Sequence, residues 1–272
     1  MLLNTFVTRA HAPRLRRRLR RCTAQGAAEV LALPSSSSEQ AALALEAVKR
    51  ACDAGVTRQA VEFVMRPTAA TDLDDWPGGQ PQRFRSLEPL VSNLLRGLGG
   101  GVPTQRVIEE GDAVVSFVSL THTAVTFPTA DTLRALKDLE ASNRSFLIIV
   151  NPAWSIAASS NFVSDFGIGP WKAANEAFVA KFVETFSLRE SRIRGQEVRI
   201  LRSFPSDYTV FALLGSETQV LGTFPERPSF AQLDLLVTAM GAASIANASV
   251  ADRLRAEIIF NKDSAGPPPP SS

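Results

Sequence analysis

Cysteine and histidine are nearly absent from this sequence, and their scarcity limits the metal and nucleophile chemistry open to it. The 272 residues include two cysteines, Cys22 and Cys52, and two histidines, His11 and His122. Two isolated cysteines build neither a disulfide framework nor a CxxC metal motif. If the first 28 residues are removed, a cysteine–histidine couple depends on Cys52 and His122 alone. Cys52 follows a helical spacing of apolar residues, which favours a small core residue, and we expect no metal site and no cofactor.

The sequence also lacks an apolar run of the roughly 18 residues that a membrane-spanning helix requires. The nearest candidate is LLVTAMGAASIANASVA at residues 235–251, which carries no charge. Polar residues such as Thr238 and Asn247 interrupt it, which favours the end of a packed helix. We therefore expect a soluble protein without a transmembrane span.

Acidic residues are missing from residues 1–28, where seven arginines occur. Subtracting these seven from the chain's 29 basic residues leaves 22 against 27 acidic residues, a net charge of −5. An acid-free, arginine-rich start with alanine and hydroxyl residues is typical of an organelle transit peptide, which we predict for residues 1–28. The competing interpretation is a basic arm that binds nucleic acid or anionic lipid.

The rest of the chain is organised as one domain with a short linker and a tail. Residues 29–35 contain proline followed by serines and are expected to be a linker. Residues 36–245 form the predicted α/β domain, which opens with the capping pair Ser36 and Glu39. Residues 246–272 form a C-terminal extension that ends in the disordered segment GPPPPSS.

Alternating helices and strands in the first part of the domain predict parallel strands joined by helical crossovers. The expected strands are residues 58–65, 112–120 and 146–150. A helix that begins at Pro170 is expected to bury an aromatic face extending from Trp171 through Phe182 to Phe186.

The chain then changes character, because residues 191–224 contain short alternating runs separated by turn signals. This pattern predicts an antiparallel meander. A last helix follows the capping pair Ser229 and Gln232. The predicted fold is a single three-layer α/β domain with a mixed sheet, parallel in its N-terminal half and antiparallel in the C-terminal meander.

One group of candidate binding residues follows the strand FLIIV, where Asn151, Pro152 and Trp154 begin a serine-rich loop. Ligands of parallel sheets bind beyond the carboxyl ends of the strands, so Asn151 could bind a partner's backbone and Trp154 could anchor it. In the structural alternative, Asn-Pro is a turn signal and Trp154 covers the end of the sheet. The turn at 167–169 has two glycines but lacks the third that a dinucleotide fingerprint needs.

Arginines form the second group of candidate binding residues. Arg192 and Arg194 stand in the meander, and Arg227 precedes the last helix. Arg192 and Arg194 could contact an acidic partner or anionic thylakoid lipid, or form the solvated face of an outer strand that blocks aggregation. Arg227 could pair with a carboxylate that holds the meander against the sheet, with binding as its secondary role. Nucleic acid is not an expected partner, because no aromatic residues alternate with these arginines and the net charge beyond residue 28 is negative.

The later half of the sequence resembles a known family. An apolar strand that ends in Asn151-Pro152-x-Trp154 is followed by an aromatic-rich segment, a meander and FPERPSFAQLD at 224–234. This pattern is similar to the domain of unknown function shared by chloroplast and cyanobacterial proteins, which include low-photosystem-II-accumulation assembly factors. The same domain type also occurs joined to a plastid adenylate kinase.

The resemblance implies a chloroplast protein of the stroma, with possible peripheral contact to the thylakoid. Its implied role is non-catalytic binding of proteins, such as photosystem II subunits or thylakoid insertion factors, during photosystem II assembly. It brings no catalytic residues. The alternative is an enzyme that binds a nucleotide or small metabolite at the carboxyl ends of the parallel strands.

Overall fold

The computed structural model of the chain describes residues 31–65, 79–99, 103–109, 114–118, 121–142, 146–154, 169–215 and 217–247. The described helices and strands all belong to one compact unit, Ala32–Ser272. The predicted transit peptide and nearly all of the C-terminal extension lie outside the described residues, so these two predictions stay predictions.

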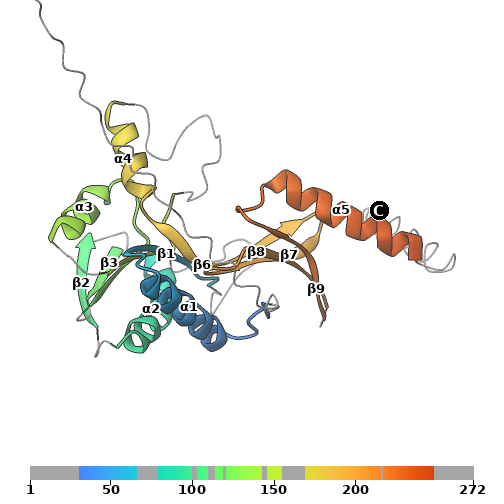
Figure 1. The fold of residues 1–272 in the computed structure, drawn as a ribbon, viewed down its shortest axis with the longest axis horizontal. Coiled ribbons are helices and arrows are strands. Elements are labelled where there is room, and N and C mark those ends of the chain that lie inside the picture. Colours follow the sequence, from blue (N-terminus) through green and yellow to red (C-terminus); the bar gives the residue numbers. More distant parts are fainter. Residues whose placement is uncertain are drawn as a thin grey trace, which may run out of the picture. The chain divides into compact units, whose positions relative to one another are not determined.

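The described strands form one nine-stranded sheet in the order β2-β3-β4-β5-β1-β6-β7-β8-β9 (Figure 1). The strands are β1 (Arg58–Glu62), β2 (Thr104–Glu109), β3 (Val114–Val118), β4 (His122–Thr126), β5 (Phe146–Val150), β6 (Val183–Ile193), β7 (Gln196–Ser203), β8 (Tyr208–Leu214) and β9 (Glu217–Phe224). The centre is parallel, because β5 pairs in parallel with β4 and β1, and β1 pairs in parallel with β6. Every other pair is antiparallel. The predicted mixed sheet and its C-terminal meander are confirmed.

Helices cover both faces of the sheet and complete the three predicted layers (Figure 1). The helices are α1 (Ser37–Asp53), α2 (Gly79–Gly97), α3 (Leu133–Ser142), α4 (Trp171–Val179) and α5 (Phe230–Asn247). In Figure 1, α1 and α2 lie on one face of the sheet, and α3, α4 and α5 lie on the other.

Helix α1 begins at the expected residue. The hydroxyl of Ser36 accepts a hydrogen bond from the backbone N–H of Glu39 at 3.2 Å. The Glu39 carboxylate accepts from the backbone N–H of Ser35 at 2.7 Å, one residue earlier than in a standard capping box. The buried face of the helix consists mainly of small residues: Ala41, Ala44, Ala47, Val48 and Ala51. Small side chains let the α1 backbone approach the sheet closely.

Two hydrophobic clusters cover the same face of the sheet. One joins α3 and α4 to the parallel strands and includes Ile149, Trp154 and Phe178. The other joins α5 to the meander and includes Ile200 and Val237. The sheet strands between the two clusters carry the charged residues described below.

The predicted helix beginning at Pro170 is only half correct. Helix α4 ends at Val179, and Phe186 belongs to strand β6. Trp171, expected on the inner face, is 57% exposed. The aromatic spacing suits a helix as far as Phe182, but the residues from Val183 onward pair in parallel with β1 and form a strand.

The second predicted strand, 112–120, is also partly wrong. Residues 114–118 form β3, which pairs antiparallel with β4. The parallel neighbour of β5 is β4 itself, and its five residues are all buried. The sequence pattern predicts no strand at HTAVT, which is less apolar than VVSFV, and so misses β4.

Candidate functional site

The carboxyl ends of the central parallel strands meet beside Asn151 and Glu62, where a parallel sheet most often binds ligands. Strand β1 ends at Glu62 and β5 ends at Val150. Asn151, Pro152 and Trp154 follow directly, and Arg227 reaches the same place from the segment before α5. The structure therefore brings four of the six sequence-predicted residues to one edge of the sheet.

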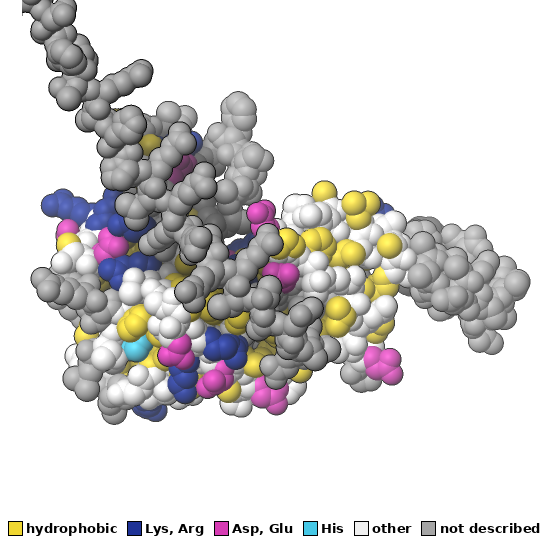
Figure 2. Space-filling model, in the orientation of Figure 1, with side chains coloured by type: hydrophobic (Ala, Val, Ile, Leu, Met, Phe, Trp, Pro, Cys, Tyr) yellow, Lys and Arg dark blue, Asp and Glu magenta, His cyan; other side chains and the backbone are white. Residues whose placement is uncertain are grey.

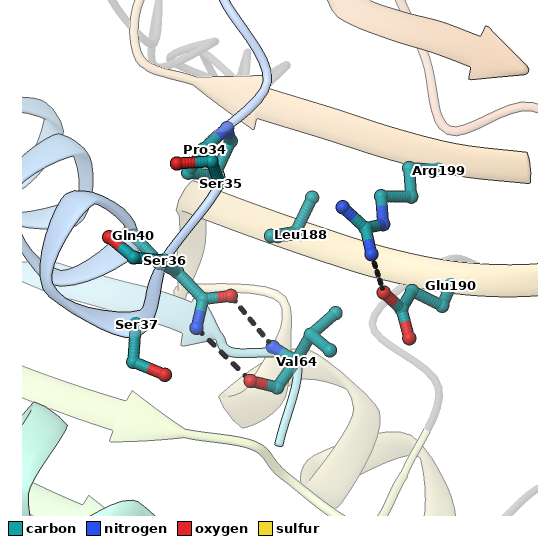
Figure 3. Close-up of a pocket in the computed structure, with 9 residues that line it drawn as sticks. All are labelled: Pro34, Ser35, Ser36, Ser37, Gln40, Val64, Leu188, Glu190 and Arg199. Carbon is teal, nitrogen blue, oxygen red and sulfur yellow. Dashed lines mark hydrogen bonds and ion pairs between the residues drawn. The ribbon is translucent and has the colours of Figure 1, made fainter. Parts of the chain in front are cut away.

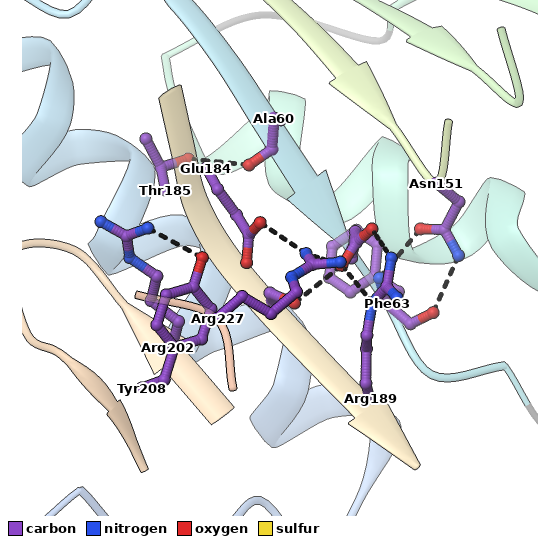
Figure 4. A network of polar contacts seen from close by, with 11 residues as sticks. Ala60, Phe63, Asn151, Glu184, Thr185, Arg189, Arg202, Tyr208 and Arg227 are labelled. Atoms are coloured by element: carbon purple, nitrogen blue, oxygen red, sulfur yellow. Dashed lines mark hydrogen bonds and ion pairs between the residues drawn. The ribbon is translucent and has the colours of Figure 1, made fainter. Parts of the chain in front are cut away.

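Asn151 is used by the fold itself. Its side-chain amide accepts a hydrogen bond from the backbone N–H of Phe63 and donates one to the backbone C=O of Phe63, both at 2.8 Å (Figure 4). The backbone N–H of Asn151 donates to the backbone carbonyl of Val61 at 2.9 Å. The amide thus continues the β1–β5 ladder after the β5 backbone turns away at φ +48°. Asparagine tolerates this left-handed backbone better than most residues.

Trp154 is a core residue, which corrects the interpretation that it anchors a partner. Its side chain is 2% exposed and packs in the cluster that contains Phe178 and Phe182. Pro152, between the two, is half-buried. The geometry agrees with the structural alternative, in which Trp154 covers the end of the sheet.

Arg227 lies at the centre of a buried polar network (Figure 4). Its Nη2 donates to the Glu62 carboxylate at 2.6 Å and to the Glu184 carboxylate at 2.5 Å. Glu62 also accepts from Arg189 and from the Ser187 hydroxyl. The side chains of Glu62, Glu184 and Arg227 are 7%, 4% and 10% exposed, so each charge is almost fully removed from water.

The pKa directions show which charges this network favours. Burial raises the pKa of the Glu62 carboxyl, but the hydrogen bond from Arg189 and the charges of Arg227 and Arg189 outweigh it, so the pKa falls below its ordinary value. Burial lowers the pKa of Arg227, but the charges of Glu62 and Glu184 raise it by more, so the net shift is upward. Glu62 is therefore a paired carboxylate and a poor general base.

An arginine–tyrosine pair lies beside the network, on the side of the meander. Arg202 Nη1 donates to the Tyr208 hydroxyl at 2.9 Å, and its guanidinium lies 4.8 Å from the centre of the Tyr208 ring. Burial and the charge of Glu184 raise the pKa of Tyr208, which keeps the phenol protonated. Hydrogen bonds with charged partners therefore connect β1, β6 and the segment before α5, and a separate one connects β7 to β8.

The family model for the Domain of unknown function (DUF1995) matches residues 34–235. The chain belongs to this family. The matched residues begin at the linker before α1 and end within α5, so they contain the whole described sheet and the Glu62–Arg227 network. No curated protein and no solved structure matches the chain.

The two meander arginines of this DUF1995 domain have different surroundings. Arg194 forms a bidentate ion pair with Asp234, at 2.6 and 2.9 Å, which joins the β6–β7 turn to α5. Arg192 is exposed and pairs in register with Glu197 on β7. Arg192 therefore lies outside the network around Arg227.

A hollow of about 160 Å³ lies at the N-terminus of α1 (Figure 3). The Gln40 amide exchanges two hydrogen bonds of 3.1 Å with the backbone of Val64, and Arg199 pairs with Glu190 at 2.6 Å. The first pair holds α1 against the segment that follows β1, and the second joins β7 to β6, so the polar groups around the hollow are already used by the fold.

Sequence reasoning missed Glu62 and Glu184, the two carboxylates that hold Arg227. Each lies in an apolar strand, and a charged residue is rarely buried unless it is paired. That rule could have marked both as partners of a distant arginine. The Gly-x-Gly turn at 167–169 stays untested as a phosphate-binding turn, because Gly167 lies outside the described residues.

In the part of the chain that the structure describes, no helix has the length and hydrophobicity to cross a membrane.

Proposed function

We propose that this protein is a non-catalytic, protein-binding factor of the chloroplast that assists photosystem II assembly or accumulation and binds its partner through α5. The observation that carries the proposal is that α5 is apolar around its circumference but packs against the sheet on one side only. Its 18 residues contain one charged side chain, Asp234. A helix that is apolar on all sides normally needs cover on all sides.

One side of α5 faces the meander and another faces outward. Leu233 and Val237 are buried against the sheet, whereas Leu235, on the outward side, and Phe230, at the start of the helix, are 69% and 68% exposed. Figure 2 shows hydrophobic side chains gathered on the visible surface of this C-terminal part of the described chain. Exposed apolar surface of this kind typically marks a contact with another protein.

The fold holds α5 firmly against the meander, so its outer side is preorganised for binding. Ser229 and Gln232 cap its first turn, the Arg194–Asp234 pair fixes that turn to the β6–β7 hairpin, and Arg227 anchors the segment before it. Binding to a helix that is already ordered costs less conformational entropy than binding to a flexible segment.

The chloroplast and photosystem parts of the proposal are supported by the acid-free, arginine-rich residues 1–28, which are predicted to be a transit peptide, and by the family resemblance. An apolar helix also suits a partner that is a subunit of a membrane complex. Subunits of a membrane complex contain apolar segments of about 20 residues that need cover before insertion, and the outer side of α5 offers a matching surface.

The experiment is affinity purification of the tagged chain from isolated chloroplasts, divided into stroma and thylakoid and mildly crosslinked. Enrichment of photosystem II subunits or insertion factors over an untagged control is the expected result. Recovery of a clean monomer from both fractions would overturn the proposed role.

The alternative function, a nucleotide- or metabolite-binding enzyme, has less support from the geometry. The polar groups at the carboxyl edge are largely used internally, because Asn151 binds Phe63 and Glu62 binds Arg189 and Arg227. A thermal-shift screen with nucleotides separates the two functions, because a ligand that binds the native state raises the melting temperature.

A further inference from the structure

The outer edge of β9 lacks the residues that usually protect the edge of a sheet. β9 stands last in the sheet order, and no described strand pairs with its other side (Figure 1). Its eight residues, ETQVLGTF, contain one charge, on Glu217, and neither lysine nor proline. Soluble proteins commonly block an exposed edge with such residues, because its free N–H and C=O groups can pair with another chain. The β9 edge is therefore open to pairing.

The opposite edge of the sheet, β2, carries the usual protection. β2 stands first in the sheet order and contains Arg106 and Glu109 among its six residues. Its ladder with β3 is also irregular between Val107 and Glu109. Charged residues and bulges both oppose edge-to-edge pairing. The two ends of the described sheet therefore differ, and β9 is the end that another strand can extend.

The first half of β9 has the regular geometry that strand pairing needs. Residues 217–220 pair one by one with β8, and the ladder shifts at Leu221, beyond this segment. All four residues are exposed, and Val220 is 47% exposed. Valine is favoured in strands because its branched side chain packs well against neighbours on a pleated surface. An added strand supplies such neighbours for Val220 and partners for the outward backbone groups.

Exposed apolar side chains gather around this edge. Among the described residues, four of the six exposed large hydrophobic side chains lie on β8, β9 or α5: Leu214, Val220, Phe230 and Leu235. Exposed apolar surface typically marks a contact with another molecule. Leu214 ends β8 and lies opposite Glu217 in register, so it stands beside the open edge. The edge thus offers apolar contacts in addition to backbone hydrogen bonds.

We propose that β9 pairs antiparallel with β9 of a second copy of this chain, so that the two sheets become one continuous sheet. A two-fold interface requires a self-complementary patch, and a nearly uncharged strand edge is one. When the pairing is centred on Gln219 or Val220, Glu217 lies opposite residue 221 or 223 of the copy. No like charges then face each other along the strand, and Val220 meets Val220 or Thr218 of the copy.

The pairing determines how the two copies present α5. Identical edges that pair antiparallel are related by a two-fold axis perpendicular to the sheet, so equivalent faces of the two sheets lie on the same side. Both α5 helices therefore lie on one face, one on each side of the axis. Phe230 and Leu235 belong to α5 and take no part in the strand-to-strand contact. The dimer thus presents two α5 surfaces, and the inference does not depend on what they bind.

The experiment is sedimentation velocity of the purified full chain, from low to high micromolar concentration. A strand-to-strand interface is small, so we expect a weak dimer with a dissociation constant of about 1–100 µM. Val220→Lys places a charge on the edge of both copies and should raise this constant at least about tenfold. Val118→Lys is the matched control, because Val118 is a 40% exposed valine on β3, away from β9, and it should dimerise normally. A monomeric wild type, or normal dimerisation by Val220→Lys, overturns the proposal.

Hydrogen exchange locates the contact independently. The backbone N–H groups of β9 should exchange more slowly in concentrated than in dilute wild-type protein, and Val220→Lys should remove this difference. Thermal unfolding identifies a variant that folds poorly, and Thr218→Lys, on the same face of β9, then replaces Val220→Lys. Protection that appears on concentration only outside β9 overturns the proposal. If β9 pairs instead with an extended segment of another protein, the purified chain stays monomeric, which also overturns it.

Discussion

Arg227 donates a 2.6 Å hydrogen bond to the carboxylate of Glu62, 165 residues earlier in the chain. This pair connects the segment before α5 to the end of the central strand β1, between the two hydrophobic clusters. Both side chains are buried, so the pair couples the position of α5 to the parallel core.

Removing either partner of this pair should destabilise the fold strongly. Arg227→Met leaves two buried carboxylates without their shared cation, and we expect a loss of roughly 3–5 kcal/mol in the free energy of unfolding. Arg192→Met is the matched control, because Arg192 is exposed, and it should change stability by less than about 0.5 kcal/mol. Urea unfolding monitored by circular dichroism measures both. Equal midpoints for the two variants would contradict the assignment of Arg227 to a buried lock.

The same carboxylate makes stability depend on pH in the acid range. The pKa of Glu62 is lower in the folded protein than its ordinary value of 4.5. Its contribution is therefore complete above pH 4.5 and is lost as the pH falls through the lower folded-state pKa. Glu62→Gln should be less stable at neutral pH and lose less stability on acidification. Parallel acid profiles for the two proteins would refute this.

Asn151 is expected to matter for folding through its side-chain amide. Asn151→Ala leaves the N–H and C=O of Phe63 without these partners and should cost about 1–3 kcal/mol. Asn151→Gly keeps the backbone freedom needed at φ +48° and should lose the hydrogen bonds alone. Chemical denaturation should rank the wild type above Asn151→Gly and that variant above Asn151→Ala. A fully stable Asn151→Ala protein would show that the amide is dispensable.

Trp154 should behave as a core residue. Trp154→Ala removes a side chain that is 2% exposed and should cost roughly 3–5 kcal/mol. Thermal unfolding tests this against Trp171→Ala, since Trp171 is 57% exposed and should tolerate the change. A Trp154→Ala protein as stable as the wild type would restore Trp154 as a candidate interface anchor.

The mixed sheet could be predicted because its strongest signals are local. FLIIV indicates a strand buried on both faces, and the turn residues between 191 and 224 divide the meander into hairpins. The helix–strand boundary near Phe182 could not be predicted, because the aromatic residues satisfy a helical spacing up to that point. The choice of strand there depends on pairing with β1, which is a tertiary contact.

The candidate site was harder to predict than the fold. Position in the sequence placed Asn151 and Trp154 correctly near the carboxyl ends of the parallel strands, whereas Arg227 was expected only to pair with an unidentified carboxylate. Whether each faces a partner or the core depends on neighbours such as Phe63 and Glu62, which the sequence does not place. Beyond the predicted transit peptide, Cys52 and His122 are the one possible cysteine–histidine couple, yet only the fold shows that α1 and β4 bring the two together.

The most direct measurement compares partner recovery from chloroplasts by the wild type and by Phe230→Glu and Leu235→Glu. Both residues are exposed on α5, so each variant should keep its melting temperature and recover about tenfold less partner, as for the loss of an interface hot spot. Trp171→Glu is the control, because Trp171 is also an exposed aromatic at the start of a helix, and it should recover partner normally. Undiminished recovery by both α5 variants would contradict the claim that this protein binds its partner through α5.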